Sequence, residues 1–271
     1  MLDHIDTSRS RVRWAGLAGR ERAGEDPAAQ AFVLLHGLTF DRRMWDPVLE
    51  ALPAQHRAIA FDLPGHGGSP MLPERGLAPV ADAIRQAVLD ADLEAPVMVG
   101  HSIGGPLASI YASRYPASGV ISVDAPLRLE PFAHGLDAVR AQFTGPGFAE
   151  LWPQFRASMH IDRVHGHRRQ LLRAGERESQ EVVVAYQADL LERPLEEVVR
   201  WRDEGLAQLA RAGTPYVALQ TEPVDPAEEA WLRGLLPQTE VQVWPVGHHF
   251  PHLADPAAFV DLMARFATPA S

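Results

Sequence analysis

Short apolar runs recur along the chain and alternate with segments whose apolar residues have helical spacing. Residues 31–35 and 119–123 are largely continuous apolar runs, which are typical of strands buried on both faces of a parallel sheet. Further strands are expected at 11–18, as an early edge strand, and at 57–61, 96–99, 214–220 and 240–244. Helices are expected at 44–52, 78–93, 106–115, 227–236 and 256–266, and a polar loop at 19–30. This alternation predicts an α/β fold with a mostly parallel, doubly wound sheet.

Helical periodicity replaces the strand pattern over residues 127–204. The exception is the strand-like run 182–184, which sits among helix formers. We therefore expect a helical cap at 127–204, lying over the carboxyl edge of a core formed by 1–126 and 205–271. Within the cap, one basic cluster is interpreted as a solvent-exposed helix face: His165, His167, Arg168, Arg169 and Arg173.

The composition limits both the partners and the chemistry. The formal net charge of −10 provides no basic footprint for a nucleic acid. The absence of cysteine excludes disulfides and thiolate catalysis. The chain also contains no lysine and no asparagine, which suits a GC-rich bacterial genome. A Schiff base, a lysine base and an asparagine oxyanion donor are therefore excluded.

The N-terminal sequence and the lengths of the apolar runs indicate the cellular compartment. The first residues show no basic region followed by an apolar one, and no run approaches the roughly 20 residues that span a bilayer. We expect a cytoplasmic protein with a small-molecule substrate and no membrane partner. A homodimer is compatible with the sequence.

A serine flanked by glycines marks the join between a predicted strand and a predicted helix. Ser102 lies two residues from both Gly100 and Gly104. In this context the Gly-x-Ser-x-Gly pattern strains the serine backbone and exposes its hydroxyl at the carboxyl end of a sheet. The N–H of Ile103, at the helix start, can then face a developing oxyanion. We predict that Ser102 is a nucleophile rather than a residue of an ordinary glycine-rich turn.

Three motifs together resemble those of the α/β-hydrolase superfamily. His36-Gly37 looks like its oxyanion loop, the Asp-Leu-Pro-Gly-His-Gly-Gly-Ser run at 62–69 is close to the loop after its fourth strand, and 100–105 is similar to its nucleophile elbow. The resemblance covers nearly the whole chain and implies a serine hydrolase with a helical cap. We expect no cofactor. Gly37 also allows the backbone to turn so that the N–H of Leu38 points into the site.

The residues after the last predicted strand resemble the superfamily's catalytic-histidine stretch, His-Phe-x-His-Leu-x-x-Pro. Matched residue by residue, the resemblance makes His249 the base, and we interpret His248 and His252 as packing residues. The three histidines are not at i, i+4 on one helix and have no paired carboxylate motif, so we expect no metal site.

The acid of the triad departs from the usual pattern. Members of the superfamily commonly carry it in a Gly-x-x-Asp context after the strand at 214–220, where this chain lacks the glycine and has Asp225 one position late. Some members place the acid after the strand that follows the nucleophile helix, and Asp124 stands there. We favour Asp124 over Asp225, while a turn or capping role for Asp124 remains the alternative.

The resulting prediction is hydrolysis of a carboxylic ester, or a related acyl bond, of a small and apolar substrate through an acyl-enzyme. The N–H groups of Leu38 and Ile103 are expected to stabilise the oxyanion. Five residues are expected to line the substrate pocket, with ordinary cap packing as the alternative for the last three: His36, His101, Trp152, Phe155 and Met159.

Two other functions remain in view. Some members of the superfamily are cofactor-independent dioxygenases that use a His/Asp dyad, which His249 and Asp124 could form. Ile103 stands where those enzymes resemble each other in carrying histidine, which argues against this alternative. A non-catalytic binding protein is disfavoured by the intact serine and histidine.

Overall fold

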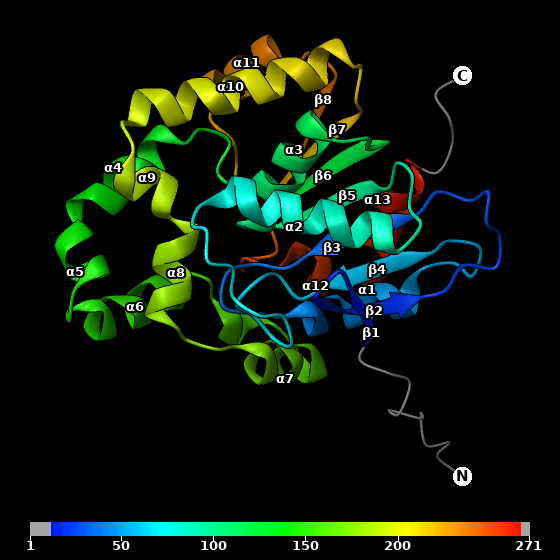
Figure 1. Cartoon of the computed structure of the whole chain (residues 1–271), viewed down its shortest axis with the longest axis horizontal. Helices are drawn as coiled ribbons and strands as arrows, with labels where there is room; N and C mark the ends of the chain where they lie inside the picture. Colours follow the sequence, from blue (N-terminus) through cyan, green and yellow to red (C-terminus); the bar gives the residue numbers. More distant parts are fainter. Residues whose placement is uncertain (1–11, 267–271) are drawn as a thin grey trace.

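The computed structural model describes residues 12–266, which form an eight-stranded sheet with helices on both faces (Figure 1). The strands are β1 (Val12–Trp14), β2 (Leu17–Arg22), β3 (Phe32–Leu35), β4 (Ala58–Phe61), β5 (Val97–His101), β6 (Gly119–Val123), β7 (Tyr216–Gln220) and β8 (Thr239–Val243). Their order is β1-β2-β4-β3-β5-β6-β7-β8, with β1–β2 and β2–β4 antiparallel and all other neighbours parallel. The predicted fold class is confirmed.

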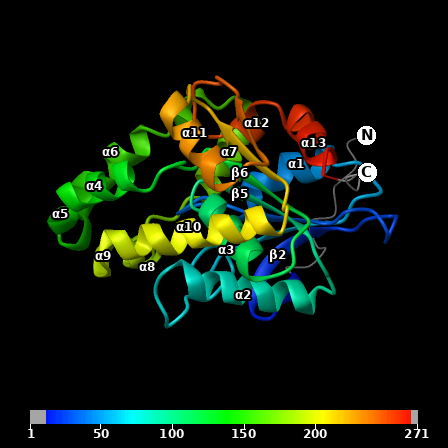
Figure 2. The same ribbon diagram turned by 90° about the horizontal axis from the view of Figure 1, so that it is seen from above.

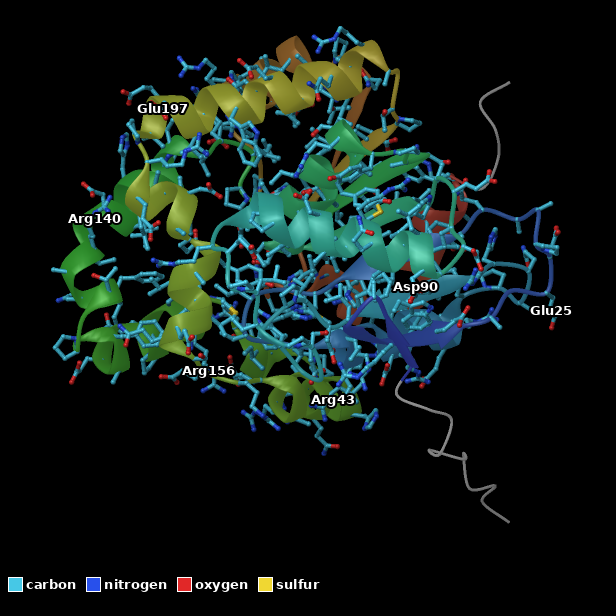
Figure 3. All side chains as sticks on the ribbon, viewed as in Figure 1. Glu25, Arg43, Asp90, Arg140, Arg156 and Glu197 are labelled. Atoms are coloured by element: carbon cyan, nitrogen blue, oxygen red, sulfur yellow. The ribbon has the colours of Figure 1, made fainter. Side chains whose placement is uncertain are left out.

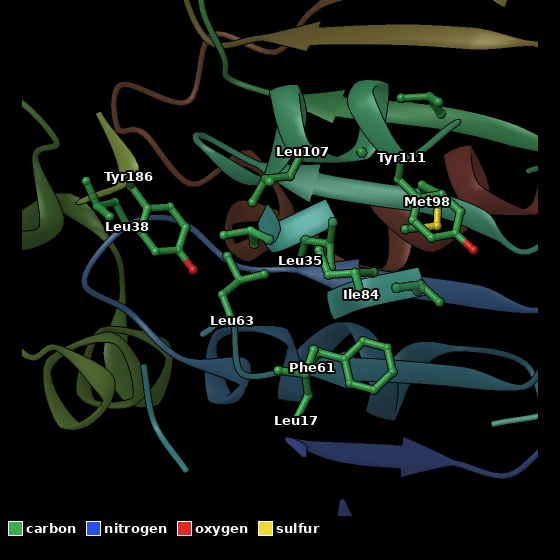
Figure 4. Packing of buried hydrophobic residues seen from close by; sticks show 14 of the residues in the cluster. Leu17, Leu35, Leu38, Phe61, Leu63, Ile84, Met98, Leu107, Tyr111 and Tyr186 are labelled. Atoms are coloured by element: carbon green, nitrogen blue, oxygen red, sulfur yellow. The ribbon is translucent and has the colours of Figure 1, made fainter. Parts of the chain in front are cut away.

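Two layers of helices cover the sheet because successive side chains of the central strands face opposite sides. On β3, Val33 and Leu35 join the apolar cluster shown in part in Figure 4, whereas Phe32 and Leu34 join a second cluster on the other face. The first cluster is completed by α2 (Leu77–Asp90), α3 (Gly104–Arg114), α10 (Leu195–Arg211) and α11 (Pro226–Leu235). The second is completed by α1 (Asp46–Ala51), which follows a 3-10 turn at Arg42–Trp45, and by α12 (Pro251–Ala254) and α13 (Pro256–Ala264).

The N-terminal edge differs from the expected single strand. Within residues 12–22 the chain forms a hairpin of β1 and β2, which turns at Ala15 (φ 43°) and Gly16 (φ 92°). Two positive φ angles in succession are those of a tight hairpin turn. The start of the expected strand, residue 11, lies outside the described residues, as does the terminal segment considered for a signal. The expected polar loop at 19–30 is also corrected, because its first four residues belong to β2.

The segment 127–204 is helical throughout its regular structure, and no strand occurs between β6 and β7. Its helices are α4 (Glu130–Ala138), α5 (Arg140–Thr144), α6 (Phe148–Ala157), α7 (Gly166–Gly175), α8 (Gln180–Tyr186) and α9 (Ala188–Glu192), with a 3-10 turn at Ile161–Arg163. The strand-like run 182–184 lies within α8. Helix α10 runs through the expected boundary at 204 and packs on α3, as Figure 2 also shows. The division into core and cap stays a prediction.

The charged side chains of Glu25, Arg156 and Glu197, labelled in Figure 3, are exposed on the surface. On α7, His167 and Arg173 are exposed, as is His165 just before the helix. Arg168 is half-buried and donates to the backbone oxygens of Leu253 and Ala254. The basic cluster is therefore a largely solvated helix face that also ties α7 to α12. Between residues 12 and 266, no helix combines the length and the apolar character needed to cross a membrane.

Candidate active site

The strand order brings three predicted site segments to one edge of the sheet. β5 lies between β3 and β6, and all three strands are parallel. Their carboxyl ends therefore meet, which gathers the loop after His36, the nucleophile candidate Ser102, and Asp124. β8 lies two places beyond β6, and the loop after it returns to this edge with His249.

Ser102 sits on a sharp turn with a left-handed backbone, φ 53°. Its N–H donates to the Val123 oxygen at 2.8 Å, which ties the turn to β6. The turn has no room for side chains: a Cβ on Gly100 would lie 1.8 Å from the Gly104 oxygen, and one on Gly104 would lie 2.5 Å from the Leu35 oxygen. Positive φ at a non-glycine residue stores strain that the surrounding structure must hold. The glycines allow that close approach and leave the serine on the bend.

His249 and Asp124 form a direct hydrogen bond, with 2.6 Å between Nδ1 and Oδ2. The other carboxylate oxygen of Asp124 accepts two bonds from Thr221, one from its N–H and one from its hydroxyl, both at 2.8 Å. Burial alone would raise the pKa of Asp124, but the bond and charge of His249 and the Thr221 bonds together hold that pKa below its ordinary value. Asp124 is thus an ionised acceptor, and Nε2 of His249 makes no hydrogen bond within residues 12–266.

Asp225 does not approach His249. It is exposed, and it caps the start of α11 by accepting a hydrogen bond from the Ala227 N–H at 2.7 Å. The structure therefore brings the favoured acid candidate, Asp124, to the histidine and leaves the alternative at a helix end.

The nucleophile elbow and the histidine loop are joined through His101. Its Nε2 donates to the His249 oxygen at 2.7 Å, and the two rings lie 4.5 Å apart. Among the hydrogen bonds of residues 12–266, none joins the Ser102 hydroxyl to His249. Serine–histidine hydrogen bonds in hydrolases are often long until substrate binds. The segments that carry Ser102 and His249 are in contact through His101. We expect the hydrogen bond between the two side chains to form when substrate binds.

Two backbone N–H groups border the serine. Within the described chain, the N–H groups of Leu38 and Ile103 have no hydrogen-bond acceptor. A Cβ on Gly37 would lie 3.4 Å from the Cβ of Ser102, so the loop carrying Leu38 passes close to the elbow. These two N–H groups are suited to receive an oxyanion.

His36 and His66 are buried side chains whose hydrogen bonds hold the loop that carries Leu38. His36 Nε2 accepts from the Leu63 N–H at 2.9 Å, and its Nδ1 donates to the Gly37 oxygen. His66 Nε2 accepts from the Thr39 N–H at 3.1 Å. The expectation that His36 lines the substrate pocket is corrected: both of its nitrogens are used within the protein and none of its surface is exposed.

The buried histidines predict a loss of stability at mildly acidic pH. Burial lowers the pKa of His36 to about 4 and that of His66 to about 3, from 6.5. Between these values and 6.5 only the unfolded chain binds the protons, so stability is fully present above pH 6.5 and falls below it. Each residue should contribute about 2 kcal/mol of this loss at pH 5. Buried His101 and His252 act in the same direction.

Urea unfolding at pH 7 and pH 5 measures this effect. The matched control is His66→Gln, whose amide can make similar hydrogen bonds without titrating, and it should show a shallower pH dependence. Equal unfolding free energies at the two pH values in the wild type would contradict the assignment of neutral, buried rings.

The remaining predicted pocket residues are also placed differently from expectation. His101 is fully buried, and Trp152 and Met159 pack inside the two apolar clusters. Phe155, also on α6, is 43% exposed. A cavity of about 310 Å³ opens elsewhere, between the loops that follow β6 and β7. None of the five predicted residues lines it; it is lined by Pro126, Leu127, Arg128, Pro131, Phe132, Gln220, Glu222, Pro223, Val224 and Glu228.

Sequence reasoning missed Thr221 and His66 as supporting residues. The position of Thr221 in the sequence could have indicated its role. It immediately follows β7, which neighbours β6, the strand that precedes Asp124. His66 carried none beyond its place in a turn-rich loop. No group of three or more histidines or acidic residues within 12–266 is arranged to hold a metal ion. His252 is fully buried, and His248 accepts a hydrogen bond from the Phe250 N–H, in keeping with packing roles.

The chain is similar in sequence to a known protein family and to one of its esterases. A family model described as "Alpha/beta hydrolase family" matches residues 32–262. The chain is 31% identical over 230 residues to the pimeloyl-[acyl-carrier protein] methyl ester esterase of Neisseria meningitidis serogroup B, covering 83% of this chain and 76% of that protein.

Solved structures agree on the architecture. A thermophilic esterase from Thermogutta terrifontis is 22% identical with a TM-score of 0.69, covering 96% of this chain and all of that one. A structure described for recognition and ring-cleavage of the Pseudomonas quinolone signal is 17% identical with a TM-score of 0.75, covering 95% and 98%. At these identities the likeness concerns the fold alone.

Proposed function

Because the chain belongs to the alpha/beta hydrolase family and is an enzyme of the carboxylic ester hydrolase type, we propose that it is a serine esterase with Ser102, His249 and Asp124 as its catalytic triad. The observation that carries this proposal is the 2.6 Å bond from Asp124 to His249 Nδ1, at the sheet edge where Ser102 sits on its strained turn. The Neisseria relative, named as a methyl ester esterase, supports an ester as the substrate.

The proposed reaction begins with proton transfer. His249 Nε2 takes the Ser102 proton as Oγ bonds to the ester carbonyl carbon, and the N–H groups of Leu38 and Ile103 receive the oxyanion. Each such donor lowers the barrier by roughly 3 kcal/mol in measured enzymes. The alkoxide then leaves with the proton from His249, and a water deprotonated by the same ring releases the acid and free serine. Asp124 stabilises the imidazolium in both halves.

A small, apolar acyl or alcohol group is the proposed substrate feature. Ser102 and Ile103 are only half-buried, whereas Leu38 beside them is almost fully buried. The site thus presents a reachable hydroxyl against apolar surroundings.

A panel of p-nitrophenyl esters tests this function. The expected result is hydrolysis with a preference among chain lengths, because an apolar site gains about 0.8 kcal/mol for each buried methylene until its walls are reached. Initial rates at several concentrations for acetate through dodecanoate give kcat/KM for each ester. Rates no higher than those of buffer for every ester would contradict the proposal.

A cofactor-independent dioxygenase is the second candidate. The observation in its favour is the His249–Asp124 dyad itself, since that chemistry uses such a pair without a serine nucleophile. Ile103 beside the serine counts against it. Oxygen uptake with a hydroxyquinolone, in the absence of ester hydrolysis, would select this candidate.

A further inference from the structure

His101 occupies the point where the three segments of the proposed active site meet. Its side chain is fully buried. It directly precedes Ser102, its ring packs 4.5 Å from the ring of His249, and its other edge faces Gly37, where a Cβ would lie 2.7 Å from Nδ1. One ring therefore contacts the nucleophile elbow, the histidine loop and the oxyanion loop.

The hydrogen bond from this ring has a defined direction. The acceptor is the backbone oxygen of His249, 2.7 Å away, so Nε2 of His101 must carry the proton. Burial lowers the pKa of His101 well below its ordinary value, so the ring is neutral and has only this one N–H. Nδ1 is bare and has no hydrogen-bond partner among the described residues. The single N–H of the His101 ring therefore donates to the backbone oxygen of His249.

The backbone of His249 is held on both sides of its Cα. Its carbonyl accepts the hydrogen bond from His101, and its N–H, in the preceding peptide group, donates to the Met159 oxygen at 3.1 Å. The Met159 contact comes from the segment after α6, whereas the His101 contact comes from the strand that carries the nucleophile. Among the hydrogen bonds of the described residues, only the one from His101 ties the backbone of His249 directly to the strand that ends at Ser102.

We propose that His101 is a positioning residue, which holds the backbone of His249 so that its imidazole stays within reach of Ser102. The proposal rests on the serine esterase function above and adds a residue that transfers no proton itself and acts through the backbone of His249. Misplacement of a reacting group by about 1 Å can lower a rate by about 10²-fold. The hydrogen bond from His101 fixes the position of the His249 loop relative to the turn that carries Ser102. Its loss is expected to shift the imidazole of His249 by a distance of this order.

His252 provides a matched control. It is also fully buried, and its ring lies 5.1 Å from that of His101 and 4.4 Å from that of Trp45. Neither of its nitrogens makes a hydrogen bond in the part of the chain described. A substitution there disturbs the same interior without removing a bond to His249.

The experiment compares His101→Leu, His101→Gln and His252→Leu by kcat and KM for a p-nitrophenyl ester, labelling rate with a fluorophosphonate, and Tm. We expect His101→Leu to lower kcat and the labelling rate by about 10²-fold with KM within about threefold of wild type. His101→Gln, which keeps an N–H donor, should recover at least about tenfold of that loss. His252→Leu should keep kcat within about threefold.

The outcomes separate the two proposals. Wild type that is labelled at Ser102, together with a folded His101→Leu that is equally fast or a His101→Gln that recovers nothing, would overturn the positioning role alone. Wild type that neither hydrolyses esters nor becomes labelled would overturn the esterase function and the positioning role with it. If His101→Leu does not fold, His101→Asn takes its place, because its shorter amide is polar but does not reach the His249 oxygen.

Discussion

Replacing Ser102 by alanine is expected to lower kcat for a p-nitrophenyl ester by about 10⁶-fold while KM changes little. The substitution removes the Oγ atom that is proposed to attack the ester carbonyl and leaves the Leu38 and Ile103 N–H groups in place. A residual rate of about 10³- to 10⁴-fold over water is then expected from the oxyanion donors and binding. Steady-state kinetics on purified protein measures the loss.

The fold should tolerate this change. Alanine at φ 53° is as strained as serine, and the neighbouring Gly100 and Gly104 still allow the strand and helix to pass. An unchanged Tm for Ser102→Ala is therefore the control. A stable variant that keeps more than about 1% of the wild-type kcat would show that another group attacks the ester.

Replacing Asp124 by asparagine should lower kcat by about 10⁴-fold. The reason lies in Thr221, whose N–H and hydroxyl both donate to Oδ1 of Asp124. In the variant these donors select the amide oxygen, which turns the amide NH₂ toward Nδ1 of His249. The imidazole must then carry its proton on Nε2, where it cannot accept one from Ser102.

Asp225→Asn is the matched control for this prediction. Asparagine is as good a helix N-cap as aspartate, and the carboxylate of Asp225 accepts a hydrogen bond from the Ala227 N–H at the start of α11. We expect its kcat within about twofold of wild type in the same assay. The acid assignment is wrong if Asp225→Asn loses turnover and Asp124→Asn keeps it.

The centre of the sheet could be predicted because its strands, β3 to β7, are buried on both faces and have largely apolar sequences. Strand 119–123 was predicted with the bounds it has, and β3, β4, β7 and β8 lie within two residues of expectation. The hairpin of β1 and β2 was missed because its turn uses alanine where asparagine or aspartate is usual, and because β2 is polar in its second half.

The core of the site was predictable for a different reason. Ser102, Asp124 and His249 follow strands, and the ends of parallel strands in one sheet converge, so their proximity follows from strand order. The pocket was not predictable. His36 and His101 stand beside the same strand ends, but their rings turn inward to hydrogen-bond backbone atoms, and strand order does not determine the direction of a side chain.

The side chains of the helical segment 127–204 were also not predictable in detail. Apolar spacing marked Trp152, Phe155 and Met159 as one class of residue, yet two are buried and Phe155 is on the surface. Periodicity identifies the apolar face of a helix, whereas the packing of several short helices decides which part of that face is covered.

Intact-protein mass measurement after treatment with a fluorophosphonate tests the central claim most directly, since the probe reacts with a serine only when a neighbouring base activates it. We predict one phosphonyl adduct per chain, mapped by peptide analysis to Ser102 and missing from Ser102→Ala. Undiminished ester turnover in wild-type protein without an adduct, or with the adduct on another residue, would contradict the account.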